Sequence, residues 1–314
     1  MPAPIAKPIV ENIKAAADIL RAGGMVAMPT ETVYGLACDA SNPAAVARLF
    51  NAKGRPAFNP LIAHINGPPM GMKEGKFSDI AGQVANKFWP GPLTLVLPLA
   101  FTHSVCDLAR SGLGTVGLRL PSHPVALDLI TAFGGPLVAP SANPSGKMSP
   151  TRARHIRDEM GDRVDLILDG GGCEHGVEST IVSFTGKDPG LLRAGAMPAE
   201  DIEAFLDKPL QRPRLDPNAP TSPGQMLRHY APEAALRLNA AQPEDGEAWL
   251  GFGPKMYGTG LNLSPSGDLI EAAARLFTAL RALDQRYDKI AVAPIPMEGL
   301  GEAINDRLER AANE

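Results

Sequence analysis

The segment 136–150 reads PLVAPSANPSGKMSP, and its polar side chains are neutral hydrogen-bonding groups and one cation: Ser141, Asn143, Ser145, Ser149 and Lys147. Such a set can bind and align an anionic ligand, and it contains no evident nucleophile. Its apolar start is typical of a short buried strand. Taken alone, the segment is more typical of a rigid turn braced by prolines, with Ser149 capping the next helix. Other parts of the chain favour the ligand site.

Two further cations lie in the stretch 53–60, KGRPAFNP. Lys53 and Arg55 are separated by one glycine, and Pro56 and Pro60 stiffen the loop. Arginine offers a planar fork of donors and lysine a point charge, which together suit phosphate oxygens. An isolated pair of this kind is more often solvated surface charge.

Arg119 lies in the middle of a predicted apolar strand over 115–121. A charge there needs a partner, which is either a carboxylate elsewhere in the protein or an anionic ligand. His64 lies on another predicted strand, 61–65, on the same face as Ile62. A single histidine in that position is more often a core residue than a ligand or base.

Hydroxyl groups and charges also follow other predicted strands. The segment 29–36, PTETVYGL, follows the strand 25–28, and Thr30 or Thr32 could equally cap a helix there. Glu178, Ser179 and Thr180 lie at the mouth of one more strand, and Arg193 ends another. Ligands in open α/β sheets usually bind at the carboxyl ends of strands, so these groups are expected to lie together.

The elements that must position these residues alternate along the chain. Apolar periodicity and turn residues predict helices over 10–21, 43–52, 78–88, 124–133, 151–160, 198–206 and 268–287, and another after Gly299. Strands are expected over 25–28, 61–65, 93–97, 115–121, 137–139, 164–168, 236–238, 249–252 and 289–293. The fold class is therefore α/β: an open sheet with helices, followed by a smaller α/β domain.

Proline usage suggests how these elements divide. We expect a first domain over 1–206, a proline-rich linker over 207–234 and a small C-terminal α/β domain over 235–314. The stretch 222–232, SPGQMLRHYAP, is unusually specific for a spacer. Our hypothesis is that it folds over the first domain's cleft as a lid, where Arg228, His229 or Tyr230 reaches a ligand. A plain spacer is the alternative.

Composition excludes several classes of protein. Aromatic residues make up 5% of the chain and the net charge is −4, which disfavours a general nucleic-acid-binding protein. Neither a GxGxxG nor a GxxxxGK[ST] motif occurs. Three separated cysteines, Cys38, Cys106 and Cys173, fit reduced thiols. With no signal-peptide pattern and no membrane-spanning run, we expect a cytoplasmic protein.

Together these segments resemble the two-domain, long form of the YrdC-like threonylcarbamoyl-AMP synthase family. The resemblance is carried by PTETVYG (29–35), KGRP (53–56), NPLI (59–62), WPGP (89–92), APSAN (139–143), GVEST (176–180) and LRAG (192–195). It continues through Pro223-Gly, HYAP (229–232), EGLG (298–301) and INDR (304–307). In the linker, this chain reads PGQML where many family members read PGMKY.

The resemblance implies a YrdC-like first domain, with a twisted, open, mixed sheet covered by helices, and a smaller Rossmann-like second domain. It also implies a reaction in which L-threonine, bicarbonate and ATP give threonylcarbamoyl-adenylate and pyrophosphate. The product would pass to a tRNA threonylcarbamoyl-transferase complex, with at most a weak contact to tRNA and none to membranes. Such phosphoryl chemistry depends on positioning and charge neutralisation more than on a nucleophile.

The resemblance also assigns roles to residues. Threonine would be bound by Thr32, His64, Arg119, Ala139 and Ser179. ATP would be bound by Lys53, Arg55, Asn59, Thr115, Ser141, Ser149, Arg193, His229 and Tyr230. The central groups for the chemistry would be Lys53, Arg55, Ser141 and Asn143. Mg²⁺ would arrive with ATP, because these motifs hold too few carboxylates for a metal cage of protein ligands.

Two alternatives stay open from the sequence. One is an RNA-binding module, which a steep salt dependence of tRNA affinity without ATP turnover would favour. The other is a carbamoyl-adenylate-forming transferase of related fold, as in hydrogenase maturation. Proteins of that second kind also carry zinc-type CxxC pairs, and none occurs in this chain.

Overall fold

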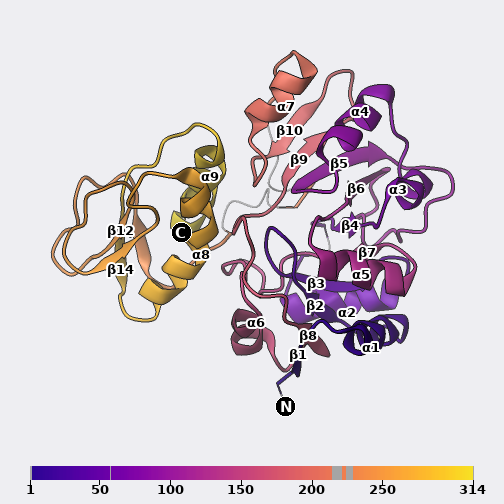
Figure 1. Ribbon diagram of the computed structural model, residues 1–314, viewed down its shortest axis with the longest axis horizontal. Coiled ribbons are helices and arrows are strands. Elements are labelled where there is room, and N and C mark those ends of the chain that lie inside the picture. Colours follow the sequence, from indigo (N-terminus) through magenta and orange to yellow (C-terminus); the bar gives the residue numbers. More distant parts are fainter. Residues whose placement is uncertain (1, 57, 214–220, 224–228, 314) are drawn as a thin grey trace.

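The computed structural model describes residues 2–56, 58–213, 221–223 and 229–313, and within these ranges the chain forms two β-sheets. The larger sheet has ten strands in the order β1-β8-β2-β3-β7-β4-β6-β5-β9-β10, and the smaller has four in the order β11-β14-β12-β13. Figure 1 shows the two sheets side by side, with a pair of helices between them.

The larger sheet is mixed. Its strands are β1 (Ile5–Ala6), β2 (Val26–Met28), β3 (Gly35–Asp39), β4 (Ile62–His64), β5 (Leu93–Pro98), β6 (Thr115–Arg119), β7 (Leu137–Val138), β8 (Leu166–Leu168), β9 (Thr180–Ser183) and β10 (Gly190–Arg193). At its centre, β4 pairs in parallel with β6 and antiparallel with β7. The parallel register places His64 directly beside Arg119.

Helices pack against this sheet, and one of them leads into a loop that carries site residues. They are α1 (Val10–Arg21), α2 (Pro43–Lys53), α3 (Pro68–Glu74), α4 (Asp79–Phe88), α5 (Pro124–Phe133), α6 (Ala153–Met160) and α7 (Ala199–Leu206). The side chain of Asn42 caps the start of α2, and Gly54 ends it with a left-handed φ of 62°. This turn directs the chain into the loop that carries Arg55.

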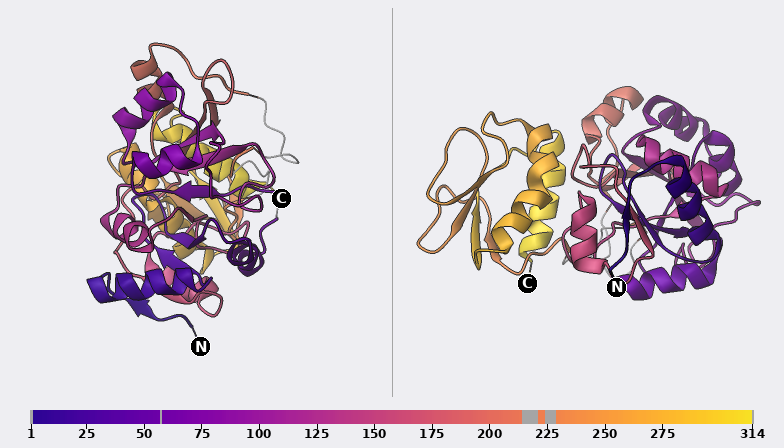
Figure 2. Two further views of the ribbon diagram at one scale, coloured as in Figure 1. Left: turned by 90° about the vertical axis from the view of Figure 1, so that its right-hand side faces the viewer. Right: turned by 60° about the horizontal axis from the view of Figure 1, so that its bottom comes forward.

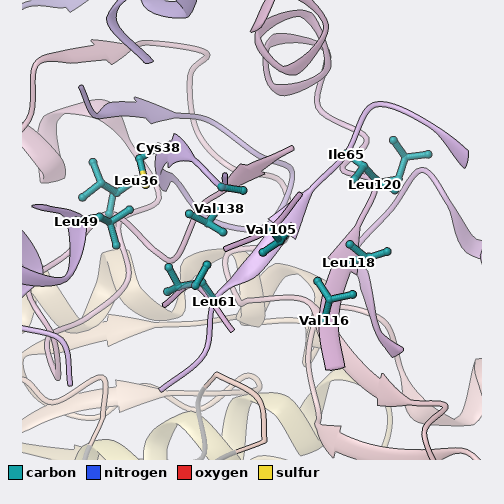
Figure 3. Close-up of a cluster of buried hydrophobic side chains, with 14 of the residues drawn as sticks. Leu36, Cys38, Leu49, Leu61, Ile65, Val105, Val116, Leu118, Leu120 and Val138 are labelled. Carbon is teal, nitrogen blue, oxygen red and sulfur yellow. The ribbon is translucent and has the colours of Figure 1, made fainter. Parts of the chain in front are cut away.

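A buried apolar layer fixes the larger sheet against α2 and the loops around it. Leu36 and Val138 on the sheet and Leu49 on α2 belong to this cluster, as do Val116 and Leu118 from β6 (Figure 3). All are almost fully inaccessible to solvent. Burial of side chains of this size is the main stabilising contribution to such a layer.

The smaller sheet is entirely parallel. It contains β11 (Ala235–Arg237), β12 (Ala248–Gly251), β13 (Gly260–Asn262) and β14 (Lys289–Val292). Two helices, α8 (Leu269–Asp284) and α9 (Leu300–Ala312), lie between this sheet and the rest of the molecule (Figures 1 and 2). Their outer faces are therefore placed to contact the first sheet's loops.

The predicted fold class, a mixed α/β sheet with a smaller α/β unit, is confirmed. Some local expectations were wrong. No helix begins at Thr30 or Thr32, because β3 follows instead, and α6 is preceded by Arg152 rather than by a capping Ser149. None of the helices in the described ranges combines the length and apolar character that a membrane crossing requires.

Candidate active site

One cavity collects residues from the centre of the larger sheet and from beyond β10. Its volume is about 50 Å³. Eight of the predicted site residues line it: Arg55, His64, Arg119, Ala139, Ser141, Arg193, His229 and Tyr230. Glu178 and Pro223 complete much of the remaining wall. The strand-end residues therefore converge, as their positions in the sequence predicted.

Arg119 has a carboxylate partner within the protein. Its Nη2 atom lies 2.6 Å from Oε1 of Glu31, and both side chains are about 95% inaccessible or more. Burial alone would raise the pKa of Glu31, but the Arg119 guanidinium outweighs it and the net shift is downward. Among the described residues, Glu31 Oε2 and Arg119 Nε have no hydrogen-bond partner. Both groups therefore keep bonding capacity beside the cavity.

His64 lies next to this pair as a neutral group. Burial, with a further effect from the positive charge of Arg119, lowers its pKa to about 3. Its Nδ1 atom is 3.3 Å from the backbone oxygen of Ile62. A neutral imidazole presents one donor and one acceptor, so this end of the cavity combines an arginine fork with a neutral hydrogen-bonding ring.

Two residues predicted to bind threonine lie behind the cavity wall. The hydroxyl oxygen of Thr32 is 2.8 Å from that of Thr30, and the hydroxyl oxygen of Ser179 is 2.8 Å from that of Thr94. Both residues are fully buried, and neither lines the cavity. Thr115 lies in a smaller neighbouring pocket that shares Ile62 and Pro223 with the main one.

Two further arginines, Arg55 and Arg193, line the cavity. Arg55 donates to the backbone oxygens of Asn59 (3.2 Å) and Pro60 (2.9 Å). Arg193 donates from Nε and Nη2 to the backbone oxygen of Ser179, at 3.1 and 2.8 Å. Burial lowers the pKa of Arg55 to about 10, which leaves it charged at neutral pH. Two fixed guanidinium groups thus face one space.

Lys53 supports the loop between β7 and α6. Its ammonium group donates to the backbone oxygens of Ser141 (2.6 Å) and Asn143, and it does not line the cavity. Burial lowers its pKa well below the usual range. Asn143 donates to the backbone oxygens of Pro144 and Lys147, while the side-chain oxygens of Asn143 and Asn59 have no partner among the described residues.

Ser149 does not line the cavity, but its hydroxyl is hydrogen-bonded to Glu178, which does. The serine hydroxyl donates to Oε1 of Glu178, whose Oε2 accepts from Arg307 at 3.0 Å. Burial alone would raise the pKa of Glu178, but Arg307 and Arg193 outweigh it and lower the pKa to about 2. The carboxylate is therefore ionised at neutral pH and holds the serine hydroxyl.

His229 and Tyr230, from the proline-rich linker, also line the cavity. Their ring centroids are 4.0 Å apart, and Tyr230 adopts a positive φ of 64°. Burial raises the pKa of Tyr230 to about 12 and lowers that of His229 to about 3, so both are neutral near pH 7. One ordered water needs roughly 10–15 Å³ of such space, so the cavity holds only a few waters. Arg228 lies outside the described residues.

Three residues of this site had no site role in the sequence prediction: Glu31, Glu178 and Arg307. Glu31 and Glu178 lie inside motifs that were noted, next to hydroxyl residues predicted to bind ligands. The available signal was chemical: a carboxylate in a buried motif requires a cation, and Arg119 lacked a partner. Nothing in the sequence pattern connected Glu178 with Arg307.

Comparison with protein families gives two matches that together span most of the chain. The Sua5/YciO/YrdC family model, described as "Telomere recombination", matches residues 18–195. The model described as "Threonylcarbamoyl-AMP synthase, C-terminal domain" matches residues 197–313. The boundary between the matches falls just after β10.

Similar proteins extend over nearly the full length. The threonylcarbamoyl-AMP synthases of Pyrococcus abyssi and Bacillus subtilis are each 39% identical, covering 96% of this chain and 94% and 93% of their own lengths. A crystal structure of P. abyssi Sua5 complexed with L-threonine superposes with a TM-score of 0.90 at 37% identity, covering 98% of this chain and 96% of that one.

Proposed function

The chain belongs to the threonylcarbamoyl-AMP synthase family, and we propose that it joins L-threonine, bicarbonate and ATP into threonylcarbamoyl-adenylate with release of pyrophosphate. The observation that carries this proposal is a single cavity lined by two kinds of group. Arg119 and the neutral His64 suit an amino acid, and Arg55 and Arg193 supply fixed cations that suit a polyphosphate.

Threonine binds beside Arg119 and His64, which are neighbours in register on β6 and β4. The guanidinium of Arg119 can pair with a carboxylate, as it already does with Glu31. His64 offers a neutral partner for a hydroxyl or amine, and Ala139 lines the same wall. The crystal structure of the P. abyssi relative with L-threonine supports this choice of amino acid.

The triphosphate binds near Arg55 and Arg193, and Ser141 lines the same cavity. The threonine nitrogen forms a bond to the carbon of bicarbonate, water leaves, and a carbamate results. A carbamate oxygen then bonds to the α-phosphorus as the bond to pyrophosphate breaks. Held guanidinium groups stabilise charge on the phosphate oxygens during this step, and Lys53 fixes the loop that presents Ser141.

Mg²⁺ bound to the nucleotide would neutralise charge on the phosphate oxygens. Within the described ranges, no three His, Cys, Asp or Glu side chains are grouped so as to hold a metal ion. Glu178 lines the cavity and is paired with Arg307, and Glu31 is paired with the cavity residue Arg119. This donor set fits an ion held by phosphate oxygens and water rather than by the protein.

Pro223, His229 and Tyr230 act as a lid. The cavity beneath them is too small for a nucleotide, so they must move for ATP to enter. Closure then shields the carbamate from water. The adenylate passes to a complex that modifies tRNA in the cytoplasm, with at most weak contact between this chain and tRNA.

Pyrophosphate release tests the proposal. Purified protein with ATP and Mg²⁺ should release pyrophosphate only when L-threonine and bicarbonate are both present. Valine lacks the hydroxyl and should be a much poorer substrate than serine, which lacks only a methyl group. Release that is independent of threonine, or equal with carbamoyl phosphate in its place, would refute the assignment.

A further inference from the structure

Two buried arginines of the small parallel-sheet unit extend into the loops of the larger sheet. Arg281 comes from α8 and Arg307 from α9, the two helices that lie between the sheets (Figure 2). Arg281 is 8% exposed and Arg307 only 1%. Charged side chains are rarely buried to this degree without specific partners.

Arg281 binds the backbone oxygens of two consecutive residues. Its Nη2 atom donates to the oxygen of Met148 at 2.5 Å and its Nη1 atom to the oxygen of Ser149 at 2.8 Å. Its Nε atom donates to Glu159 at 2.8 Å. The planar guanidinium therefore fixes the backbone of Ser149 from outside the larger sheet.

Arg307 acts on the side chain of the same serine through Glu178. It donates to Oε2 of Glu178 at 3.0 Å, while the Ser149 hydroxyl donates to Oε1 of that carboxylate. Its Nη1 atom also donates to the backbone oxygen of Ala194, at 2.8 Å. The guanidinium carbon lies 5.3 Å from the ring centroid of Tyr230, within the range of a cation–π contact.

The contact between the two units is packed as a core. Met148, Val177 and Tyr230 belong to the same buried cluster as the apolar residues of α8 and α9. The Thr151 and Thr278 hydroxyl oxygens are 3.0 Å apart across the contact. A packed contact of this kind holds the two arginines at fixed distances from the cavity.

We infer that Arg281 and Arg307 are positioning residues through which the second unit fixes Glu178 at the wall of the reaction cavity and Ser149 behind it. This inference rests on the proposed function and extends it. The second unit is then part of the site's structure, and it does more than anchor the linker that carries His229 and Tyr230. Neither arginine lines the cavity, so each acts through another residue.

The surroundings of Glu178 predict how the pH dependence of activity changes when Arg307 is removed. The groups that face Glu178 are Arg307 from α9, Arg193 from β10, the Ser149 hydroxyl, and His229 and Tyr230 from the linker. Without Arg307, burial would raise the pKa of Glu178 and the acid form would become accessible at higher pH. A protonated Glu178 accepts less well from Ser149, so activity should fall earlier on acidification.

The test compares Arg281→Met, Arg281→Lys, Arg307→Met and Arg307→Lys in the full chain. Arg275→Ala is the matched control, because Arg275 lies on α8 in an exposed pair with Glu271. Amide hydrogen exchange of peptides covering 137–151 and 176–180 measures how well ordered the segments containing Ser149 and Glu178 are. Steady-state kinetics and pH profiles of pyrophosphate release measure how that order affects activity.

We expect both Met variants to exchange faster in these peptides and to lose about 10²-fold in kcat, with smaller changes in KM. Arg307→Met should also move the acid limb of the profile to higher pH. Both Lys variants keep the charge but lose the fork, so they should retain the fold and the acid limb while losing part of kcat. Arg275→Ala should match the unmodified protein.

The inference is overturned if folded Lys or Met variants show unchanged exchange and unchanged kcat. It is also overturned if they lose stability alone, with normal kinetics at a temperature where they are folded. If the unmodified chain releases no pyrophosphate with threonine and bicarbonate, the proposed function fails instead. The exchange data then still decide whether the arginines order the wall.

Discussion

At the scale of single residues, the cavity is defined by buried charges that are paired across long stretches of chain. Glu31 pairs with Arg119 and Glu178 with Arg307, and all four side chains are almost inaccessible to solvent. Buried pairs contribute little net stability, and breaking one leaves an uncompensated charge. Their value here is geometric, because each pair fixes a donor or acceptor at the cavity.

Arg55 offers a direct test of whether the cavity arginines bind phosphate. Replacing it with alanine removes a guanidinium from the cavity, so kcat/KM for ATP should fall by about 10²-fold or more. Arg48→Ala is the control, since Arg48 lies on α2 in a half-exposed pair with Asp165 and should leave the kinetics unchanged. Urea unfolding separates lost charge from lost fold. Normal kinetics in a folded Arg55→Ala variant would exclude the phosphate role.

The buried neutral histidine gives a pH prediction for stability. His64 has a folded pKa of about 3 against an ordinary value of 6.5. Between these values the unfolded chain binds a proton that the folded chain does not, so acid favours unfolding. From pH 6.5 to 4.5, this site should cost at most about 1.4 kcal/mol of unfolding free energy per pH unit.

Urea titrations of the unmodified protein and of His64→Asn at several pH values check this effect. The variant should lose less stability on acidification over that window. Glu178 keeps its depressed pKa in both proteins, so its contribution, which grows as the pH approaches 4.5, cancels in the comparison. Parallel pH curves for the two proteins would show that His64 is not buried neutral.

At the scale of elements, the site forms where strand ends of the larger unit meet helices of the smaller unit. Gly176, the first residue of the GVEST motif, has a φ of +72° and lies against α8. A Cβ there would be 2.4 Å from the backbone oxygen of Ala273 and 2.6 Å from Cα of Ala274. Only glycine fits this backbone conformation and this close approach.

Gly176→Ala should therefore destabilise the protein by the backbone cost and by about 1–3 kcal/mol of overpacking. Gly171→Ala is matched, since Gly171 has a φ of +87° but nothing within 4 Å of a built Cβ. The difference in urea unfolding free energy between the two variants isolates the packing against α8. Equal losses in both would mean that the contact with α8 is not close.

The sequence predicted elements with strong periodicity and missed those without it. The stripe of Ile13, Ala16, Ala17 and Leu20 was sufficient for α1. By contrast, β3 follows a threonine-rich turn that resembles a helix start, and β13 is three residues long and partly exposed. Short strands depend on pairing with distant segments, which local patterns do not encode.

For the site, strand ends predicted which residues converge, but not how they pair. Arg119 evidently needed a partner, yet Glu31 is 88 positions away, and Arg307 lies 129 positions from Glu178. Such partners are set by sheet order and by contact between the two units. The resemblance to known motifs supplied the ligand roles, which stay predictions for Thr32, Ser179, Thr115 and the other assigned residues.

At the scale of the whole molecule, the two sheets are joined by a shared apolar cluster. Met148, Val177 and Ala196 from the larger unit pack with α8 and α9 of the smaller. A contact of this kind predicts that neither unit unfolds alone, although multidomain proteins often unfold in separate steps.

The chain's two tryptophans, Trp89 and Trp249, allow this coupling to be measured. Trp89 belongs to the larger unit and Trp249 to the smaller. In Trp249→Phe and Trp89→Phe variants, fluorescence reports one unit at a time, and each variant's fluorescence midpoint in urea should coincide with its midpoint by circular dichroism. Distinct midpoints within one variant would show independent units and weaken the inferred role of Arg281 and Arg307.

The central claim is that one cavity joins an amino acid, bicarbonate and a nucleotide, and mass spectrometry of the product tests it most directly. The protein is incubated with ATP, Mg²⁺, L-threonine and ¹³C-bicarbonate, and the adenylate is analysed before it hydrolyses. The account predicts threonylcarbamoyl-adenylate carrying one ¹³C atom, formed in equal amount with pyrophosphate. An unlabelled threonyl-adenylate, or pyrophosphate without any labelled adenylate, would contradict it.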